Sequence, residues 1–88
     1  MDIEFDPAKR EKILKNRGLD FLDAPKLFVG RSLTVLDDRK DYGEERFITY
    51  GFLDTAAVAL VWTDRGGATR IISMRKMHIE EVKHVGLV

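Results

Sequence analysis

The chain has 88 residues, of which 44% are hydrophobic and 34% are charged, a composition typical of one packed domain spanning residues 1–88. It contains no cysteine, which excludes disulfides, thiolate nucleophiles and zinc–thiolate sites. Its 15 basic and 15 acidic residues cancel, and this balance argues against a histone-like nucleic-acid binder.

The apolar segments are too short to cross a membrane. The longest uncharged one, residues 55–63, falls well below the roughly 20 residues that a spanning helix needs. The N-terminus opens with Asp2, Glu4 and Asp6, opposite in sign to the start of a signal peptide. We therefore expect a soluble, cytoplasmic protein without a membrane partner.

Asp6 and Pro7 predict the start of the first helix, because aspartate is a good N-cap and proline suits the first helical position. The helix is expected to run from Pro7 to about Arg17, where Gly18 can take the left-handed conformation that ends a helix. The preceding apolar segment, Ile3–Phe5, is expected to form a short edge strand.

A second helix is predicted to follow Asp20, which can cap it. Four apolar residues recur at helical spacing: Phe21, Ala24, Leu27 and Phe28. Pro25 disturbs the first turn, so this helix should be short or kinked. Gly30 is expected to end it.

From residue 31 onward the apolar period changes to two, which predicts strands. The expected strands are Ser32–Asp37, Arg46–Leu53, Ala56–Thr63 and Thr69–Lys76. Their short connections favour antiparallel pairing in a meander, and a last helix at about His78–His84 completes the order β-α-α-β-β-β-β-α. We therefore predict an α+β domain with a four-stranded antiparallel sheet. Its helices should pack on one face and leave the other to water or a partner.

The last predicted strand carries charge within an apolar run. Strict alternation places Ile71, Ser73 and Arg75 on one face and Arg70, Ile72, Met74 and Lys76 on the other. A guanidinium in such a strand needs water, a carboxylate or an anionic ligand beside it. Extension into solvent at the strand ends explains Arg70 and Lys76, but it explains Arg75 less well.

The charges are unevenly distributed along the chain. Residues 31–45 carry three basic and five acidic residues, whereas residues 46–76 carry five basic and two acidic ones. Such asymmetry points to an anionic ligand or an acidic partner, although charges scattered over solvated faces give the same count.

The segment 37–46 combines acids, bases and Tyr42. These groups suit phosphoryl-ester chemistry without metal, with a carboxylate taking the proton of a 2′-hydroxyl and guanidinium groups stabilising charge on phosphorus. A solvated hairpin entry held by surface ion pairs is the alternative interpretation.

No metal or cofactor site is expected. His78 and His84 are six residues apart and do not share a helix face. Gly66 and Gly67 lack the Lys-Ser/Thr that follows a phosphate-binding glycine loop.

Several strings of residues carry a family resemblance. In chain order they are Asp37-Asp38-Arg39, Asp41-Tyr42-Gly43-Glu44-Glu45-Arg46, Thr63-Asp64-Arg65-Gly66 and Arg70-Ile71-Ile72-Ser73-Met74-Arg75-Lys76. They closely resemble the BrnT family, ribonuclease toxins of type II toxin–antitoxin systems with a RelE-like fold. Phe5-Asp6-Pro7 and Gly18 also fall at the family's spacing, so the likeness covers nearly the whole chain.

The resemblance implies a metal-independent endoribonuclease that inhibits translation by RNA cleavage. It also implies neutralisation by a BrnA-like antitoxin, through which alone the pair would contact DNA. Residue by residue, it implies Glu44, Arg70 and Arg75 as catalytic, with Glu44 as the base. The implied substrate-binding residues are Arg39, Arg46, Arg65 and Lys76.

Three positions depart from the family pattern. Arg17 stands where a histidine is frequent, Phe5 where a tryptophan is frequent, and Val85 near the usual place of a tyrosine. If the last helix of the family contacts RNA, this chain would be weak or inactive. The alternative function is therefore a non-catalytic protein-interaction module on the same fold, which would bind a partner in an apolar groove.

Overall fold

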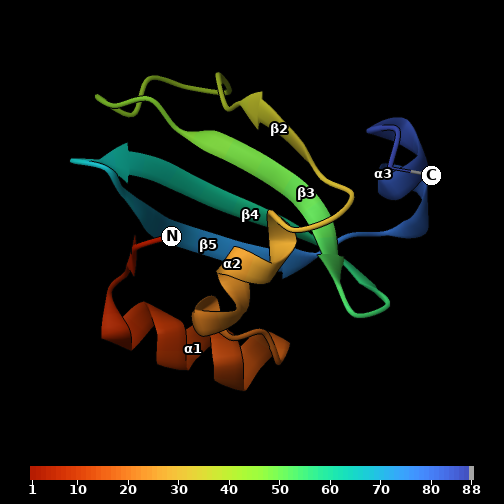
Figure 1. Ribbon diagram of the computed structural model, residues 1–88, viewed down its shortest axis with the longest axis horizontal. Helices are drawn as coiled ribbons and strands as arrows, with labels where there is room; N and C mark the ends of the chain where they lie inside the picture. Colours follow the sequence, from red (N-terminus) through yellow and green to blue (C-terminus); the bar gives the residue numbers. More distant parts are fainter. Residues whose placement is uncertain (88) are drawn as a thin grey trace.

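The computed structural model of this protein describes residues 1–87 and shows an α+β fold built on one sheet (Figure 1). The strands are β1 (Ile3–Glu4), β2 (Leu33–Leu36), β3 (Phe47–Leu53), β4 (Ala56–Arg65) and β5 (Ala68–Lys76). They lie in the order β1-β5-β4-β3-β2, and each neighbouring pair from β2 to β5 is antiparallel. The predicted α+β class and the predicted strand segments are confirmed.

The sheet nevertheless has five strands and is mixed, where the sequence predicted four antiparallel ones. β1 pairs in parallel with the start of β5, with Ile3 opposite Thr69 and Glu4 opposite Arg70. The backbone N–H of Thr69 also donates to the carbonyl oxygen of Asp2 at 2.8 Å. The edge strand expected near Ile3–Phe5 therefore extends the sheet past β5. This long-range pairing leaves no mark in local periodicity.

The first helix has the predicted bounds, because both of its ends are specified locally. α1 (Pro7–Arg17) begins after Asp6, whose carboxylate accepts from the backbone N–H of Ala8 at 2.9 Å. It ends at Gly18, which has a φ of 69° and donates its N–H to the carbonyl oxygen of Leu14. None of the helices within residues 1–87 is long and apolar enough to cross a membrane.

The second helical segment is short and broken, as predicted. It consists of a 3-10 turn at Phe21–Asp23 followed by α2 (Ala24–Leu27). Pro25 has no N–H to donate to the carbonyl of Phe21, so an α-helix cannot run continuously through this segment. Asp20 caps the turn by accepting from the N–H of Leu22 at 3.0 Å.

The core lies between α1, α2 and one face of the sheet (Figure 1). Its buried members are Ile13, Leu19, Phe21, Ala24, Leu27, Val58, Leu60, Ile71 and Met74. α2 approaches β3 closely at Gly51, where a Cβ would lie 2.8 Å from the carbonyl oxygen of Leu27. The face of the sheet that carries Val58 and Leu60 is therefore sealed by the two N-terminal helices.

The last helix does not join that layer, so the prediction that all helices pack on one face is wrong. α3 (Ile79–His84) lies at the end of the sheet, away from α1 and α2 (Figure 1). Its Val82 lines a groove together with Phe52 and Ala57. Phe52 and Ala57 are a cross-strand pair next to Val58, so their side chains lie on the opposite face of the sheet from Val58. Burial of Val82 and Leu87 holds α3 in this position.

A β-bulge in β5 changes which of its side chains share a face. Val61 pairs with Ser73 and Trp62 pairs with Ile71, which leaves Ile72 as an extra residue. Ile71 and Met74 consequently both face the core, whereas Ile72 and Ser73 both face the opposite side together with Arg75. The predicted strict alternation is wrong for this reason. The bulge is what brings Ser73 and Arg75 to the face that the N-terminal helices leave uncovered.

Candidate functional site

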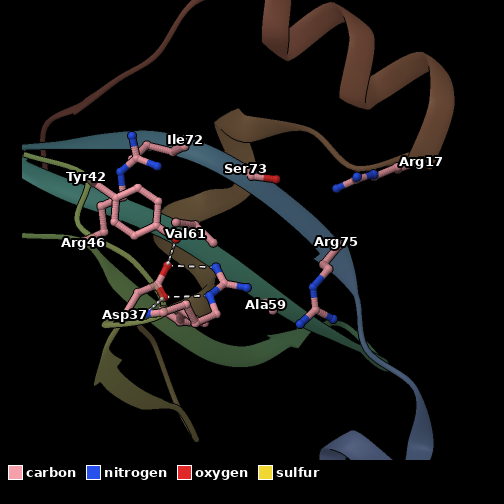
Figure 2. Close-up of a pocket in the computed structure, with 11 residues that line it drawn as sticks. Arg17, Asp37, Tyr42, Arg46, Ala59, Val61, Ile72, Ser73 and Arg75 are labelled. Atoms are coloured by element: carbon pink, nitrogen blue, oxygen red, sulfur yellow. Dashed lines mark hydrogen bonds and ion pairs between the residues drawn. The ribbon is translucent and has the colours of Figure 1, made fainter.

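A cavity of about 230 Å³ lies on the face of the sheet opposite α1 and α2 (Figure 2). Its polar lining consists of Arg17, Asp37, Arg39, Tyr42, Arg46, Ser73 and Arg75, and its apolar lining consists of Ile48, Ala59, Val61 and Ile72. Four guanidinium groups thus meet one carboxylate. This excess of positive charge in a partly enclosed space favours an anionic ligand.

Short side chains in the sheet make room for the cavity. Ala59 of β4 lies opposite Arg75 of β5, and Val61 lies opposite Ser73. Neither alanine nor serine fills the space above its strand, so Arg75 and its neighbours stand around a hollow. Figure 2 shows Asp37 and Tyr42 at one end of this hollow and Arg75 at the other, with Ala59 between them.

Asp37 holds the side chains of Arg39 and Tyr42 in place at one end of the cavity. Its side chain is only 1% exposed, and it accepts from Nε and Nη2 of Arg39 at 2.7 and 2.8 Å. The hydroxyl of Tyr42 donates to the same carboxylate at 3.3 Å. The Arg39 guanidinium lowers the pKa of Asp37 to about 2, and Asp37 in turn raises the pKa of Arg39. Asp37 is therefore an ionised positioning group with both oxygens occupied, and it is unsuited to accept a proton near neutral pH.

This pair predicts a pH-dependent contribution to stability. Because the pKa of Asp37 falls from 3.8 to about 2 on folding, the contribution is fully present above pH 3.8 and is lost as the pH falls through about 2. Asp37→Asn is expected to lower the free energy of unfolding by about 1 kcal/mol at pH 7, a modest value because Arg39 is 63% exposed. Urea denaturation should show this difference shrinking between pH 4 and pH 2. The exposed neighbour Asp38→Asn is the control, and an equal or pH-independent loss in both variants would contradict the assignment.

Arg75 is held at the other end by the last helix. Its Nη1 and Nη2 donate to Oε1 and Oε2 of Glu81, each at 2.7 Å. The Arg75 side chain is 42% exposed and that of Glu81 is 27% exposed. This pairing raises the pKa of Arg75 and lowers the pKa of Glu81, so both groups are ionised near neutral pH.

Arg17 enters the cavity from the end of α1. β1 covers only the start of β5, so the later part of β5 has a free outer edge. The guanidinium of Arg17 donates from Nη1 to the carbonyl oxygen of Met74 at this edge, at 2.7 Å. The residue that departs from the family pattern before Gly18 therefore contributes a cation to the cavity.

Arg46 is the fourth arginine of the cavity and lies beside Tyr42. Its guanidinium carbon lies 4.1 Å from the centre of the Tyr42 ring, a cation–π distance. Its Nε also donates to Glu44 at 3.3 Å. The aromatic ring and Glu44 together fix the direction of Arg46.

The structure brings together three of the seven predicted site residues, Arg39, Arg46 and Arg75. Glu44 does not line the cavity but lies beside it, between Arg46 and Arg65, with its second oxygen 3.6 Å from Arg65. Arg70 is roughly 16 Å from Arg75 along β5, because Arg75 lies five positions after it in the strand. Lys76 lines the apolar groove beside α3.

The outlying charges form a chain that leads away from the cavity. Glu4 lies 4.0 Å from Arg65 and 3.5 Å from Arg70, and Glu44 continues the series to Arg46. Within residues 1–87, no group of three or more His, Cys, Asp or Glu side chains has an arrangement that could hold a metal ion.

Sequence reasoning missed Asp37, Arg17 and Ser73 as members of the site. Asp37 ends an apolar strand two residues before an arginine, and this spacing suits the bidentate pair that forms. No comparable signal marks Arg17, whose partner Met74 is 57 residues away in the chain. Ser73 reaches the cavity only because of the bulge in β5.

The family model described as "Ribonuclease toxin, BrnT, of type II toxin-antitoxin system" matches residues 5–81. A comparison with curated proteins finds no match. The matched range contains every residue that lines the cavity, and it ends at Glu81, the partner of Arg75.

Proposed function

The chain belongs to the BrnT family of ribonuclease toxins of type II toxin–antitoxin systems, and from this premise we propose that it is a metal-independent endoribonuclease that inhibits translation by cleaving RNA. The observation that carries the proposal is the cavity, whose lining contains four arginines, Arg17, Arg39, Arg46 and Arg75, and a single carboxylate that is already bonded to Arg39. An RNA phosphodiester supplies the negative charge that this arrangement lacks.

The arginines suit phosphate because each guanidinium presents a planar fork of N–H donors. Arg39 has its fork directed at Asp37 but is 63% exposed, so its remaining donors reach solvent. Arg75 stands at the opposite end of the cavity. A phosphate between these ends would be contacted from both sides. We assign Arg65 and Arg70, which lie farther along the face, to neighbouring phosphates of the same strand.

The reaction proposed is attack by the 2′-oxygen of RNA on the adjacent phosphorus. The new P–O bond forms as the bond to the 5′-oxygen breaks, which leaves a 2′,3′-cyclic phosphate and a 5′-hydroxyl. A carboxylate takes the 2′ proton, and the leaving oxygen receives a proton from solvent. The guanidinium groups stabilise the charge that builds on the non-bridging oxygens in the transition state.

Glu44 is the carboxylate we assign as base. Asp37 and Glu81 each accept two short bonds from one arginine, and their pKa values are lowered. Glu44 has longer contacts, at 3.3 Å to Arg46 and 3.6 Å to Arg65. Phosphate binding at Arg46 would weaken the first of these contacts and release an oxygen beside the substrate.

The same charges support the proposed metal independence. Four guanidinium groups repel a divalent cation, and the one carboxylate of the cavity is committed to Arg39 and Tyr42. We expect cleavage of labelled RNA by the purified chain to proceed equally in EDTA and in Mg²⁺. Loss of cleavage in EDTA that Mg²⁺ restores would contradict the proposal.

We propose a BrnA-like antitoxin as the neutralising partner, with contact to DNA only through it. The family implies an antitoxin. Two apolar surfaces offer places for one, the groove beside α3 and the edge strand β2. The edge strand β2 exposes Leu33, Val35 and Leu36, and it leads directly into Asp37. Growth arrest on expression of the chain alone, relieved by co-expression of the antitoxin, is the expected result.

A non-catalytic interaction module is the second candidate function. The observation that favours it is the occupation of Arg75 by Glu81, which neutralises one cation of the cavity. The module would leave RNA intact at every concentration tested and would still form a stable antitoxin complex. The RNA assay in EDTA therefore separates the two candidates.

A further inference from the structure

Arg75 differs from the other cavity arginines in where its partner comes from. Asp37, the partner of Arg39, directly follows β2 and has a side chain that is 1% exposed. Glu81 comes from α3, a separate element at the end of the sheet, and its side chain is 27% exposed. The carboxylate of Asp37 is therefore buried, whereas solvent reaches the carboxylate of Glu81 as well as its partner Arg75.

The contact with Glu81 has the form that a bound phosphate would take. Both terminal nitrogens of Arg75 donate to the two oxygens of one anion, each at 2.7 Å. Carboxylates and phosphates present two oxygens to a guanidinium in the same bidentate geometry. Glu81 thus occupies the same donors, and cancels the same charge, that an RNA phosphate requires.

The helix that carries Glu81 is held by few contacts. α3 has six residues, and its N-cap His78 makes no side-chain capping bond. A helix of this length is not stable by itself, so it depends on Val82, on Leu87 and on the pair with Arg75. Local release of such a segment requires much less free energy than global unfolding.

We propose that Glu81 is a built-in competitor for the substrate: it occupies Arg75 in the resting chain, and an RNA phosphate must displace it. This inference rests on the proposed function, whose cavity it regulates. α3 would then set the affinity of the cavity for anions without contributing a group to the reaction. Removing the carboxylate is expected to strengthen binding of RNA, which is the opposite of the effect of removing a binding residue.

The test measures binding of a fluorescein-labelled, uncleavable 2′-O-methyl RNA of eight nucleotides by fluorescence anisotropy. Glu81→Gln should bind it about fivefold more tightly than the wild type, the size expected for one half-exposed bidentate pair. Glu80→Gln is the matched control. It removes a carboxylate from the same turn of α3, yet Glu80 is in no ion pair among residues 1–87, so it should change binding by less than twofold.

A second pair of variants keeps the inference falsifiable. In an Arg75→Ala background, Glu81→Gln should have no effect, because the competitor has lost its target. Equal gains in the Glu80 and Glu81 variants, or a gain that persists without Arg75, would overturn the inference in favour of a general charge effect. The absence of any gain would overturn it as well. Cleavage of unmodified RNA is measured in parallel, so that failure of the nuclease proposal is seen as intact RNA in every variant and is distinguishable from these outcomes.

Discussion

Arg75→Ala is expected to lower the rate constant of RNA cleavage about 100- to 1,000-fold, the effect of removing one preorganised donor from a transition state. Arg75 forms one end of the cavity, and Ala59 opposite it offers no polar group that could substitute. Its side chain is 42% exposed, so truncation creates no buried void and should leave the sheet and its core intact. The measurement is the cleavage rate of labelled RNA in EDTA at saturating enzyme.

Arg31→Ala is the matched control for this prediction. Arg31 is exposed, lies outside the cavity and carries the same charge, so its loss should change the rate by less than twofold. Arg75→Lys should fall between the two, because lysine keeps the charge but not the planar fork. Similar losses in Arg31→Ala and Arg75→Ala would show that only net charge matters, and full activity of Arg75→Ala would remove the cavity from the mechanism.

The sequence predicted the helices and strands well because their ends are set by local signals. Asp6 with Pro7 and Gly18 fix α1, and Pro25 breaks the second helix, each through contacts within a few residues. What could not be predicted depends on distant pairing. β1 joins β5 across more than 60 residues, and it does so through backbone groups that every residue type has.

The site shows the same division between local and distant information. Arg39 and Arg46 flank Tyr42 in one loop, and the resemblance identified both arginines from contiguous strings. The bulge at Ile72 determines which residues of β5 reach the cavity, and the apolar periodicity of the sequence does not predict this bulge. The sequence marks Arg17 only as a departure from the family pattern. Its place in the cavity could not be predicted, because it depends on a free edge of β5 that forms only on folding.

The arrangement of carboxylates narrows the choice of a general base. Among residues 1–87, three carboxylates pair with arginines of the cavity, and two of them, Asp37 and Glu81, have lowered pKa values. Such groups hold arginines in place but accept protons poorly near neutral pH. Glu44 is the third, and its longer contacts with Arg46 and Arg65 are the reason for assigning it as the base.

Glu44→Gln is expected to lower the cleavage rate constant by about 100-fold or more, the range found for loss of a general base. Glutamine preserves the shape and can still accept from Arg46, but it cannot take the 2′ proton. Binding of the uncleavable 2′-O-methyl RNA should be unchanged or tighter, because the substitution removes a negative charge beside Arg46 and Arg65. If Glu44 is the base, the variant should lose cleavage rate but keep its affinity for RNA. If Glu44 has a purely structural role, rate and affinity should fall together.

Glu45→Gln is the matched control for Glu44→Gln. Glu45 also precedes β3 and is in no ion pair among residues 1–87. It should cleave RNA within twofold of the wild-type rate. If Glu44→Gln matches this control, Glu44 is not the base, and another group or solvent must take the 2′ proton. If Glu44→Gln instead loses rate and affinity equally, Glu44 acts by orienting Arg46, and the reaction relies on the guanidinium groups with solvent as the base.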